Sequence, residues 1–136
     1  MQPPNPASTP PADLSLSLAR SQATAEESLK EVLAVGPLAI TPTEHMARAD
    51  GQALTLSARE LRLLTELARR ADQIVSREQL VELVWGRPMR PGDRSVDVYI
   101  RKLRVKLDAA LPHWSFIHTH FGFGYRLAAE PSSRQK

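Results

Sequence analysis

The sequence predicts an α+β domain with an N-terminal antiparallel sheet, three helices and a C-terminal β-hairpin. Short, partly alternating apolar stretches broken by Gly36, Pro42 and the Asp50–Gly51 pair indicate the strands. Two helix-start signals and one long amphipathic stretch indicate the helices. A run of aromatic and polar residues around Gly122 and Gly124 is typical of two strands joined by a tight turn.

Only part of the 136-residue chain is expected to fold. Residues 1–29 are rich in proline and small polar side chains and are predicted to be a disordered tail, because they cannot bury enough apolar surface. Thr24 and Glu27 have the spacing of a capping box and could begin a short helix within it. The predicted domain covers residues 30–129, and residues 130–136 are predicted to be a disordered C-terminal tail.

The strands are expected in the stretches EVLAVGPLAI, HMARAD and ALTL, which lie between residues 31 and 56. Together these stretches predict two to four antiparallel strands. The Asp50–Gly51 pair is a good hairpin signal, because a type I′ turn needs a positive φ at both central residues and these two residue types tolerate it.

The first two helices have start signals of the same kind. Ser57 and Glu60 form one predicted capping box, and Ser76 and Gln79 form another. An apolar pair at the spacing of a hydrophobic staple flanks each box: Leu56 with Leu61, and Val75 with Leu80. The repeated arrangement predicts two helices separated by a short loop.

The third helix is predicted over residues 93–107, after a loop at residues 86–92 that contains two prolines and two glycines. Asp93 is its predicted N-cap. An apolar stripe at helical spacing is expected to face the core: Val96, Ile100, Leu103 and Leu107. The other faces carry Arg94, Ser95, Val98, Arg101, Lys102 and Val105.

Charge is unevenly distributed along the chain. Residues 93–106 alone carry a net charge of +3, as much as the whole chain, whereas residues 1–56 are net acidic. Cations beside small side chains on one helix face suit DNA, because arginine can fork onto guanine edges or phosphates and small groups permit close approach. An ordinary solvated helix would carry a similar pattern, so this helix alone leaves both interpretations open.

The stretch FIHTHFGFGYRL, residues 116–127, raises other kinds of chemistry. His118 and His120 would share one face of a strand, but no third ligand for a metal ion has a helpful spacing. Gly122 and Gly124 lack the third glycine and the following helix of a dinucleotide loop. No nucleophile or pair of titratable groups suggests catalysis. The sequence therefore predicts no metal, no cofactor and no enzyme.

Composition narrows the class of protein further. The chain contains no cysteine, which excludes disulfides, thiolate metal sites and a cysteine nucleophile. It has no apolar run of the roughly 20 residues that span a bilayer, and its N-terminus lacks a signal-peptide pattern. We therefore expect a cytoplasmic protein that does not enter a membrane.

Taken together, residues from about 32 to 128 resemble the winged-helix DNA-binding domain of the OmpR/PhoB family of bacterial transcription regulators. Three stretches in the right order carry the resemblance: LTLSARELRLLTELARRADQIVSREQLVELVWG, DRSVDVYIRKLRVKL and GFGYRL. The resemblance implies a winged helix-turn-helix fold in which the C-terminal hairpin is the wing. It also implies sequence-specific binding of double-stranded DNA, with helix 93–107 in the major groove and wing 116–127 near the backbone or minor groove.

The resemblance also implies which residues approach DNA. The matching positions are Trp85, Arg94, Ser95, Val98, Tyr99, Arg101, Lys102, Arg104, Thr119 and Tyr125. Arg101 and Lys102 are the main candidates for groove and phosphate contacts, whereas Trp85 and Tyr99 could equally well pack internally. Since Asp97 would repel phosphate, we expect it to orient an arginine, with Arg126 as the candidate.

Partners follow from the same resemblance. The loop at residues 86–92 matches the loop that family members present to RNA polymerase, although here it is basic, so that Arg87 and Arg90 could add phosphate contacts. Two copies could bind as a dimer on half-sites about one helical turn apart.

Two further departures from the family pattern affect the predicted function. The family usually couples this domain to a phosphoacceptor receiver domain, and we expect none here because only the proline-rich tail precedes the domain. Phe121 stands where many members carry an arginine that reaches into the minor groove. These departures suggest an alternative function, a protein-interaction module that docks on RNA polymerase or another regulator.

Overall fold

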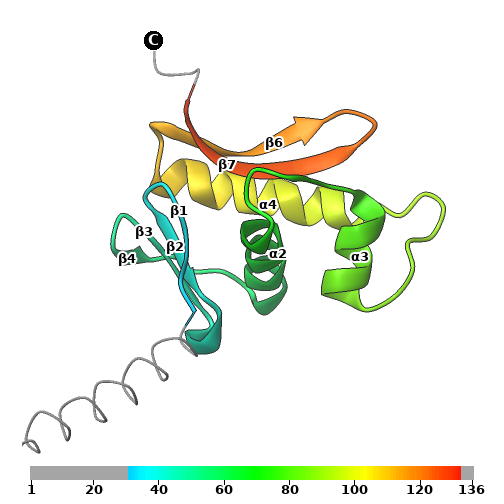
Figure 1. Ribbon diagram of the computed structural model, residues 1–136, viewed down its shortest axis with the longest axis horizontal. Coiled ribbons are helices and arrows are strands. Elements are labelled where there is room, and N and C mark those ends of the chain that lie inside the picture. Colours follow the sequence, from blue (N-terminus) through cyan, green and yellow to red (C-terminus); the bar gives the residue numbers. More distant parts are fainter. Residues whose placement is uncertain (1–30, 133–136) are drawn as a thin grey trace, which may run out of the picture. The chain divides into compact units, whose positions relative to one another are not determined.

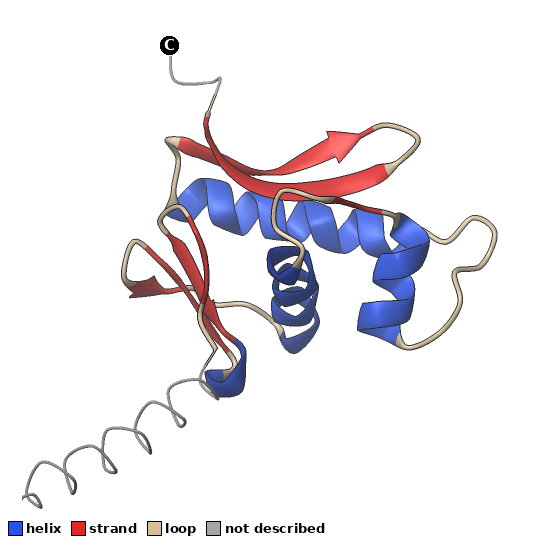
Figure 2. Ribbon diagram, viewed as in Figure 1, coloured by secondary structure: helices blue, strands red, loops and turns tan. Residues whose placement is uncertain are grey.

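The computed structural model describes residues 31–132 and confirms the predicted α+β architecture (Figures 1 and 2). The predicted helix start at Thr24 and the tail assigned to residues 1–29 lie outside this range. Residues 32–132 belong to one folded unit. Its elements are β1 (Leu33–Val35), β2 (Leu38–Thr41), the 3-10 helix η1 (Pro42–Glu44), β3 (Met46–Ala49), β4 (Gln52–Ala53), α2 (Ala58–Arg69), β5 (Ile74–Val75), α3 (Arg77–Trp85), α4 (Ser95–Ala110), β6 (Trp114–His120) and β7 (Gly124–Pro131).

The first sheet is antiparallel, with the strand order β1-β2-β3-β4. Asp50 and Gly51 make the turn between β3 and β4, and their φ angles of 54° and 86° confirm the predicted hairpin. The last strand is shorter than the predicted stretch ALTL, since only Ala53 of that stretch lies in β4. The residues after it lead directly into the N-cap of α2.

Side-chain caps begin the first two helices, with both bonds of the predicted capping box at α2 and one of them at α3. At α2, Glu60 N donates to Ser57 Oγ at 3.1 Å, and Ser57 N donates to Glu60 Oε1 at 2.8 Å, which completes the capping box. At α3, Gln79 N donates to Ser76 Oγ at 3.1 Å. The caps satisfy backbone N–H groups that a helix leaves without an internal partner.

The bounds of α4 differ from the prediction at both ends. The helix begins at Ser95, two residues after the predicted N-cap, and continues to Ala110 instead of ending at Leu107. Asp93 precedes the N-cap position but still binds the first residue of the helix. Its Oδ1 accepts from Ser95 N at 2.9 Å and from Ser95 Oγ at 2.6 Å. The N-cap position itself is occupied by Arg94, which has no side-chain cap bond.

The second sheet contains the predicted hairpin and one strand that was not predicted. Its order is β5-β7-β6, and β5 pairs Val75 with Tyr125. The predicted C-terminal boundary at residue 129 is wrong, since β7 continues to Pro131, which pairs with Trp114 of β6. The backbone hydrogen bonds of β6 keep these two additional residues in the sheet.

The core lies between the helices and the two sheets, and it includes buried residues of β1, β2 and β3. Figure 1 shows α4 running along the β6–β7 hairpin. Helices α2 and α3 both pack against α4. The predicted apolar stripe of α4 is confirmed, because all four members are buried: Val96, Ile100, Leu103 and Leu107. Lys106 Nζ joins α4 to α2 by donating to the buried carboxylate of Glu60 at 2.6 Å. Burial alone would raise the pKa of Glu60, but hydrogen bonds from Lys106 and Ser57 lower it below the usual value.

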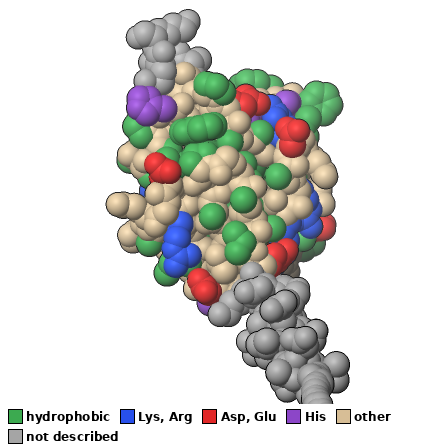
Figure 3. Space-filling model, turned by 60° about the vertical axis from the view of Figure 1, so that its left-hand side comes forward, with side chains coloured by type: hydrophobic (Ala, Val, Ile, Leu, Met, Phe, Trp, Pro, Cys, Tyr) green, Lys and Arg blue, Asp and Glu red, His purple; other side chains and the backbone are tan. Residues whose placement is uncertain are grey.

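Charge is mixed on the side of the molecule where the first sheet lies. Figure 3 shows acidic and basic side chains scattered among apolar ones on this face, with no gathering of either sign. Within residues 31–132, no helix is both long and apolar enough to cross a membrane.

Candidate nucleic-acid interface

The exposed face of α4 presents three cations and two valines. Its members are Arg94, Val98, Arg101, Lys102 and Val105. They recur at intervals of three or four residues, so they form a stripe on the side opposite the buried one. Val98 is 46% exposed and Val105 is 64% exposed. This face therefore combines positive charge with small apolar groups that a partner can approach closely.

Arg101 and Lys102 lie at the centre of this stripe. Lys102 Nζ lies 4.8 Å from the centroid of the Tyr99 ring, which is a cation–π contact. Within residues 31–132, no hydrogen bond or ion pair engages the side chain of Arg101. Both groups are exposed, so they can bind an anion without breaking an ion pair of the fold.

Trp85 and Tyr99 pack against each other at the junction of α3 and α4. Their ring centroids are 5.5 Å apart and the rings meet edge to face at 71°. The guanidinium of Arg59 lies 4.9 Å from the centroid of Trp85. Both aromatic residues are half-buried, so packing is one of their roles and part of each ring faces solvent beside the α4 stripe.

Asp97 joins α3, α4 and the wing. Its Oδ1 accepts from the Tyr125 hydroxyl at 2.5 Å, and its Oδ2 accepts from Arg77 Nη1 at 2.9 Å. Arg94 Nη1 lies 3.5 Å from the same Oδ2. The expectation that Asp97 orients an arginine is confirmed, but the choice of Arg126 is wrong.

Arg126 faces the other side of the sheet. Its Nη1 donates to Asp72 Oδ1 at 2.8 Å and its Nη2 donates to Glu130 Oε2 at 3.3 Å. The prediction failed because the two faces of a strand alternate, and Arg126 points away from Asp97 while its neighbour Tyr125 points toward it.

Tyr125 is a buried residue that stabilises the fold. It is only 8% exposed, and burial, followed by the hydrogen bond to Asp97, raises its pKa to about 12. The neutral phenol is therefore favoured in the folded state. Its stabilising contribution is complete below the unfolded pKa of about 10 and is lost as the pH rises through about 12.

We expect Tyr125→Phe to lower the free energy of unfolding by about 1–2 kcal/mol at neutral pH, because Asp97 loses its hydroxyl donor. The difference between wild type and variant should shrink as the pH rises from 10 toward 12. Urea denaturation across this range measures it. If the difference stays constant with pH, ionisation of Tyr125 is not linked to stability in the way proposed.

Arg104 of α4 holds the wing by hydrogen bonds to β6. Its Nη2 donates to Ile117 O at 2.9 Å and to Thr119 Oγ1 at 2.6 Å, and its Nε donates to Ile117 O at 3.2 Å. Arg104 and Thr119 were both predicted to approach DNA. The structure pairs them with each other, because Arg104 lies on the side of α4 that faces β6, and both residues are half-buried.

Replacing Arg104 with methionine should therefore affect stability more than DNA affinity. We expect Arg104→Met to lower the free energy of unfolding by about 1–3 kcal/mol, since Ile117 O loses a charged donor. Arg101→Met is the matched control on the exposed face and should stay within about 0.5 kcal/mol of wild type. Urea denaturation of both variants checks the prediction, and equal losses would contradict it.

The loop at residues 86–92 is tied to the start of α4. Arg87 Nη1 donates to Asp93 Oδ2 at 2.7 Å, and Arg87 Nη2 donates to Ser95 Oγ at 3.3 Å. The hydrogen bonds from Ser95, and then from Arg87, hold the pKa of Asp93 well below its usual range. Arg87 is therefore committed to this cluster, whereas Arg90 is exposed at the loop surface.

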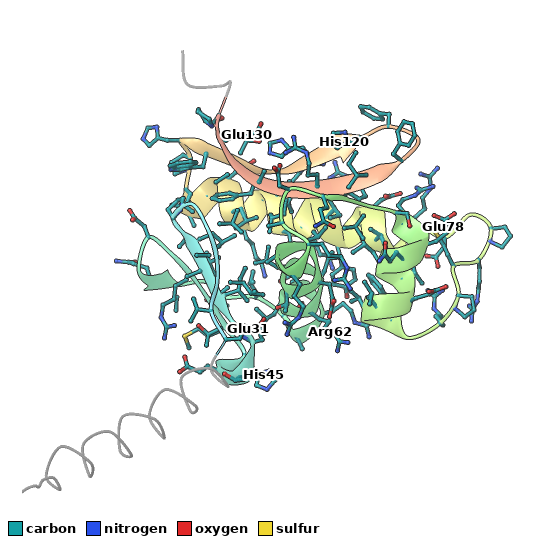
Figure 4. The ribbon with its side chains drawn as sticks, viewed as in Figure 1. Glu31, His45, Arg62, Glu78, His120 and Glu130 are labelled. Atoms are coloured by element: carbon teal, nitrogen blue, oxygen red, sulfur yellow. The ribbon has the colours of Figure 1, made fainter. Side chains whose placement is uncertain are left out.

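The two histidines of the wing have separate partners. His118 Nε2 lies 2.9 Å from Ala128 O, and His120 Nε2 accepts from Arg126 Nε at 3.0 Å. Figure 4 shows His120 toward the tip of the hairpin and Glu130 toward its other end. Among the described residues, no group of three histidine or carboxylate side chains is arranged to hold a metal ion.

Arg77 belongs to this region but was not among the site residues predicted from the sequence. It begins α3, reaches Asp97, and lines a groove between the helix ends and the wing tip. A cation in the first turn of a helix is unfavourable against the helix dipole, so its presence there was a signal that it has a specific partner.

The fold and this exposed helix face define a winged-helix domain, and solved structures of the same shape support that class. The DNA-binding domain of CpxR from E. coli superposes with a TM-score of 0.66 and 36% identity, covering 72% of this chain and 96% of that one. The Klebsiella pneumoniae RstA DNA-binding domain in complex with the RstA box gives 0.65 and 34%, covering 72% and 97%.

Curated relatives match the same region. SphR of Synechococcus elongatus, an alkaline phosphatase synthesis transcriptional regulatory protein, is 40% identical over 96 residues, which are 71% of this chain and 37% of that protein. The transcriptional regulatory protein PrrA of Mycobacterium leprae is 41% identical over 111 residues, 81% of this chain and 46% of that protein. The chain therefore spans less than half the length of these relatives.

The family model for the C-terminal domain of transcriptional regulatory proteins matches residues 51–127. The chain belongs to this family, which is the OmpR/PhoB type of winged-helix domain predicted from the sequence.

Proposed function

We propose that this chain binds double-stranded DNA sequence-specifically and acts in the regulation of bacterial transcription, with α4 in the major groove. The observation that carries the proposal is the exposed stripe of α4, where Arg101 and Lys102, which form no ion pair within the described residues, lie beside small apolar groups. Arginine and lysine suit guanine edges and phosphates, and valine suits the thymine methyl group.

The proposed interface is narrower than the set of residues predicted from the sequence. It keeps Arg94, Val98, Arg101 and Lys102 on α4, Ser95 at its start, and the exposed edges of Trp85 and Tyr99 near the phosphate backbone. Arg104, Thr119 and Tyr125 support it from inside by fixing the wing on α4.

The wider context of the chain extends this proposal. RstA, whose DNA-binding domain has the same fold, was solved in complex with its DNA box, which supports duplex DNA as the partner here. We further propose that the loop at residues 86–92 contacts RNA polymerase through its exposed surface. Two copies of the chain would bind neighbouring half-sites on DNA. The protein would act in the cytoplasm. The class of the relatives supports a regulatory role without a catalytic one.

Selection of binding sites from random duplex DNA, followed by fluorescence anisotropy, tests the proposal. We expect one enriched motif, bound at least about a thousandfold more tightly than unrelated DNA. The logarithm of affinity should fall linearly with the logarithm of salt concentration, by about 0.9 for each phosphate contacted. Failure to enrich any motif, with equal binding to all duplexes, would reject sequence-specific recognition.

A further inference from the structure

Two phenylalanines project from the tip of the wing. Phe121 is 88% exposed and Phe123 is 72% exposed, which makes them the two most exposed large hydrophobic residues in the described part of the chain. A single exposed apolar side chain is common on protein surfaces. Two aromatic rings on either side of one glycine form a concentrated apolar tip, and such a tip suits contact with a partner.

The tip is held in a defined position. Phe123 N donates to His120 O at 2.8 Å and closes the turn, with Gly122 at φ 83° where a type II turn requires a positive φ. Behind the turn, the bonds of Arg104 and Tyr125 fix the hairpin to α4. Because the rings are presented on a fixed support, binding them costs little conformational entropy.

The tip also lies beside charged side chains at the ends of two helices. It forms one wall of a groove of about 400 Å³, and the first turns of α3 and α4 form the other wall. Arg77 and Arg94 lie on that second wall together with Glu78 and Asp97, and both arginines pair with Asp97. A DNA duplex matches this alternation, because sugar edges and base faces lie within its grooves and phosphates lie along their rims.

We propose that Phe121 and Phe123 act as an apolar wedge that enters the minor groove beside the segment bound by α4 and partly unstacks one base step. The inference rests on the proposed DNA-binding function. Apolar wedges of this kind kink the duplex toward the major groove. Pyrimidine–purine steps open most easily, so the wedge should select such a step at a fixed distance from the bases read by α4.

The test uses the full chain and the selected duplex, labelled at its two ends so that energy transfer reports bending while anisotropy reports affinity. Phe121→Ala/Phe123→Ala should weaken binding about tenfold or more, remove most of the bend, and relax selection of the pyrimidine–purine step. The salt slope should not change, since no phosphate contact is lost.

Two matched variants serve as controls. Phe121→Leu/Phe123→Leu keeps apolar bulk at the tip and should retain most of the bend. Val32→Ala/Ile74→Ala removes two exposed apolar side chains outside the groove and should change neither affinity nor bend. Thermal unfolding of all variants should match that of wild type, because the replaced side chains are exposed.

The outcomes separate this inference from the function on which it rests. Wild-type affinity and bending in Phe121→Ala/Phe123→Ala would overturn the wedge and leave DNA binding intact. An affinity loss with a flatter salt slope would also overturn it, because the tip would then act through phosphate contacts. If wild type binds no selected duplex, the proposed function itself fails.

Discussion

Replacing Arg101 and Lys102 together with alanine is expected to weaken binding to the selected DNA site about a hundredfold. A well-placed cation on a guanine edge contributes about 1–3 kcal/mol, and 1.4 kcal/mol corresponds to a factor of ten. The salt dependence should flatten as well, by about 0.9 for each phosphate contact that is lost. Fluorescence anisotropy at several salt concentrations measures both effects.

This variant separates binding from folding, because neither side chain supports the domain through an ion pair. Lys102 contacts the Tyr99 ring, and within residues 31–132 the side chain of Arg101 has no hydrogen bond or ion pair. The free energy of unfolding should therefore stay within about 0.5 kcal/mol of wild type. Arg48→Ala/Arg69→Ala removes the same charge from β3 and α2, and it should leave affinity nearly unchanged.

Unchanged affinity and an unchanged salt slope in the Arg101→Ala/Lys102→Ala variant would remove α4 from the interface. An equal loss in the Arg48→Ala/Arg69→Ala control would have a different meaning. It would show that net charge attracts DNA to the whole surface, so that the stripe on α4 has no special role.

Much of the fold was predictable because its signals are local in the sequence. The capping box at Ser57 and Glu60 and the turn at Asp50–Gly51 are each specified by residues within four positions of one another. The exposed stripe of α4 was predictable for the same reason, since helical periodicity alone places its members opposite the core. Strand β5 was missed because two residues carry no periodicity and form a strand only by pairing with β7.

The roles of individual polar residues were less predictable because they depend on distant partners. Arg104 and Arg101 are both cations on one helix, and only the position of β6 shows that the first is held by Thr119 while the second remains available. Tyr125 likewise lies 28 positions from Asp97. Sequence periodicity shows which face of a helix is exposed, but contacts across the fold determine which of its charges are free.

Gly124→Ala is expected to destabilise the domain by about 3 kcal/mol or more, through a clash that the surrounding structure cannot easily relieve. A Cβ atom at this position would lie 2.1 Å from Val75 O and 2.9 Å from the Cα of Ser76. Both are backbone atoms, one at the end of β5 and one at the N-cap of α3, so no side-chain rotation can make room. The φ angle of 148° adds further strain, because side chains other than glycine rarely adopt it.

Gly122→Ala is the matched control, two residues away in the same hairpin. Its φ angle of 83° is also unfavourable for alanine, but a Cβ atom there would meet nothing within 4 Å. We expect a loss of about 1 kcal/mol from backbone strain alone. Urea denaturation gives the free energy of unfolding of both variants, provided that the denaturant slope stays the same. Gly122→Ala reports backbone strain alone, and Gly124→Ala reports strain together with the clash.

The comparison tests how the wing is mounted. If Gly124→Ala costs no more than Gly122→Ala, the β7 backbone does not approach β5 as closely as the structure shows. If it costs the expected amount, the close contact of Gly124 with Val75 holds the wing, next to its tip, against the end of β5. DNA affinity should then fall in Gly124→Ala even at temperatures where the domain stays folded, because Phe121 and Phe123 would no longer stand opposite Arg77 and Arg94.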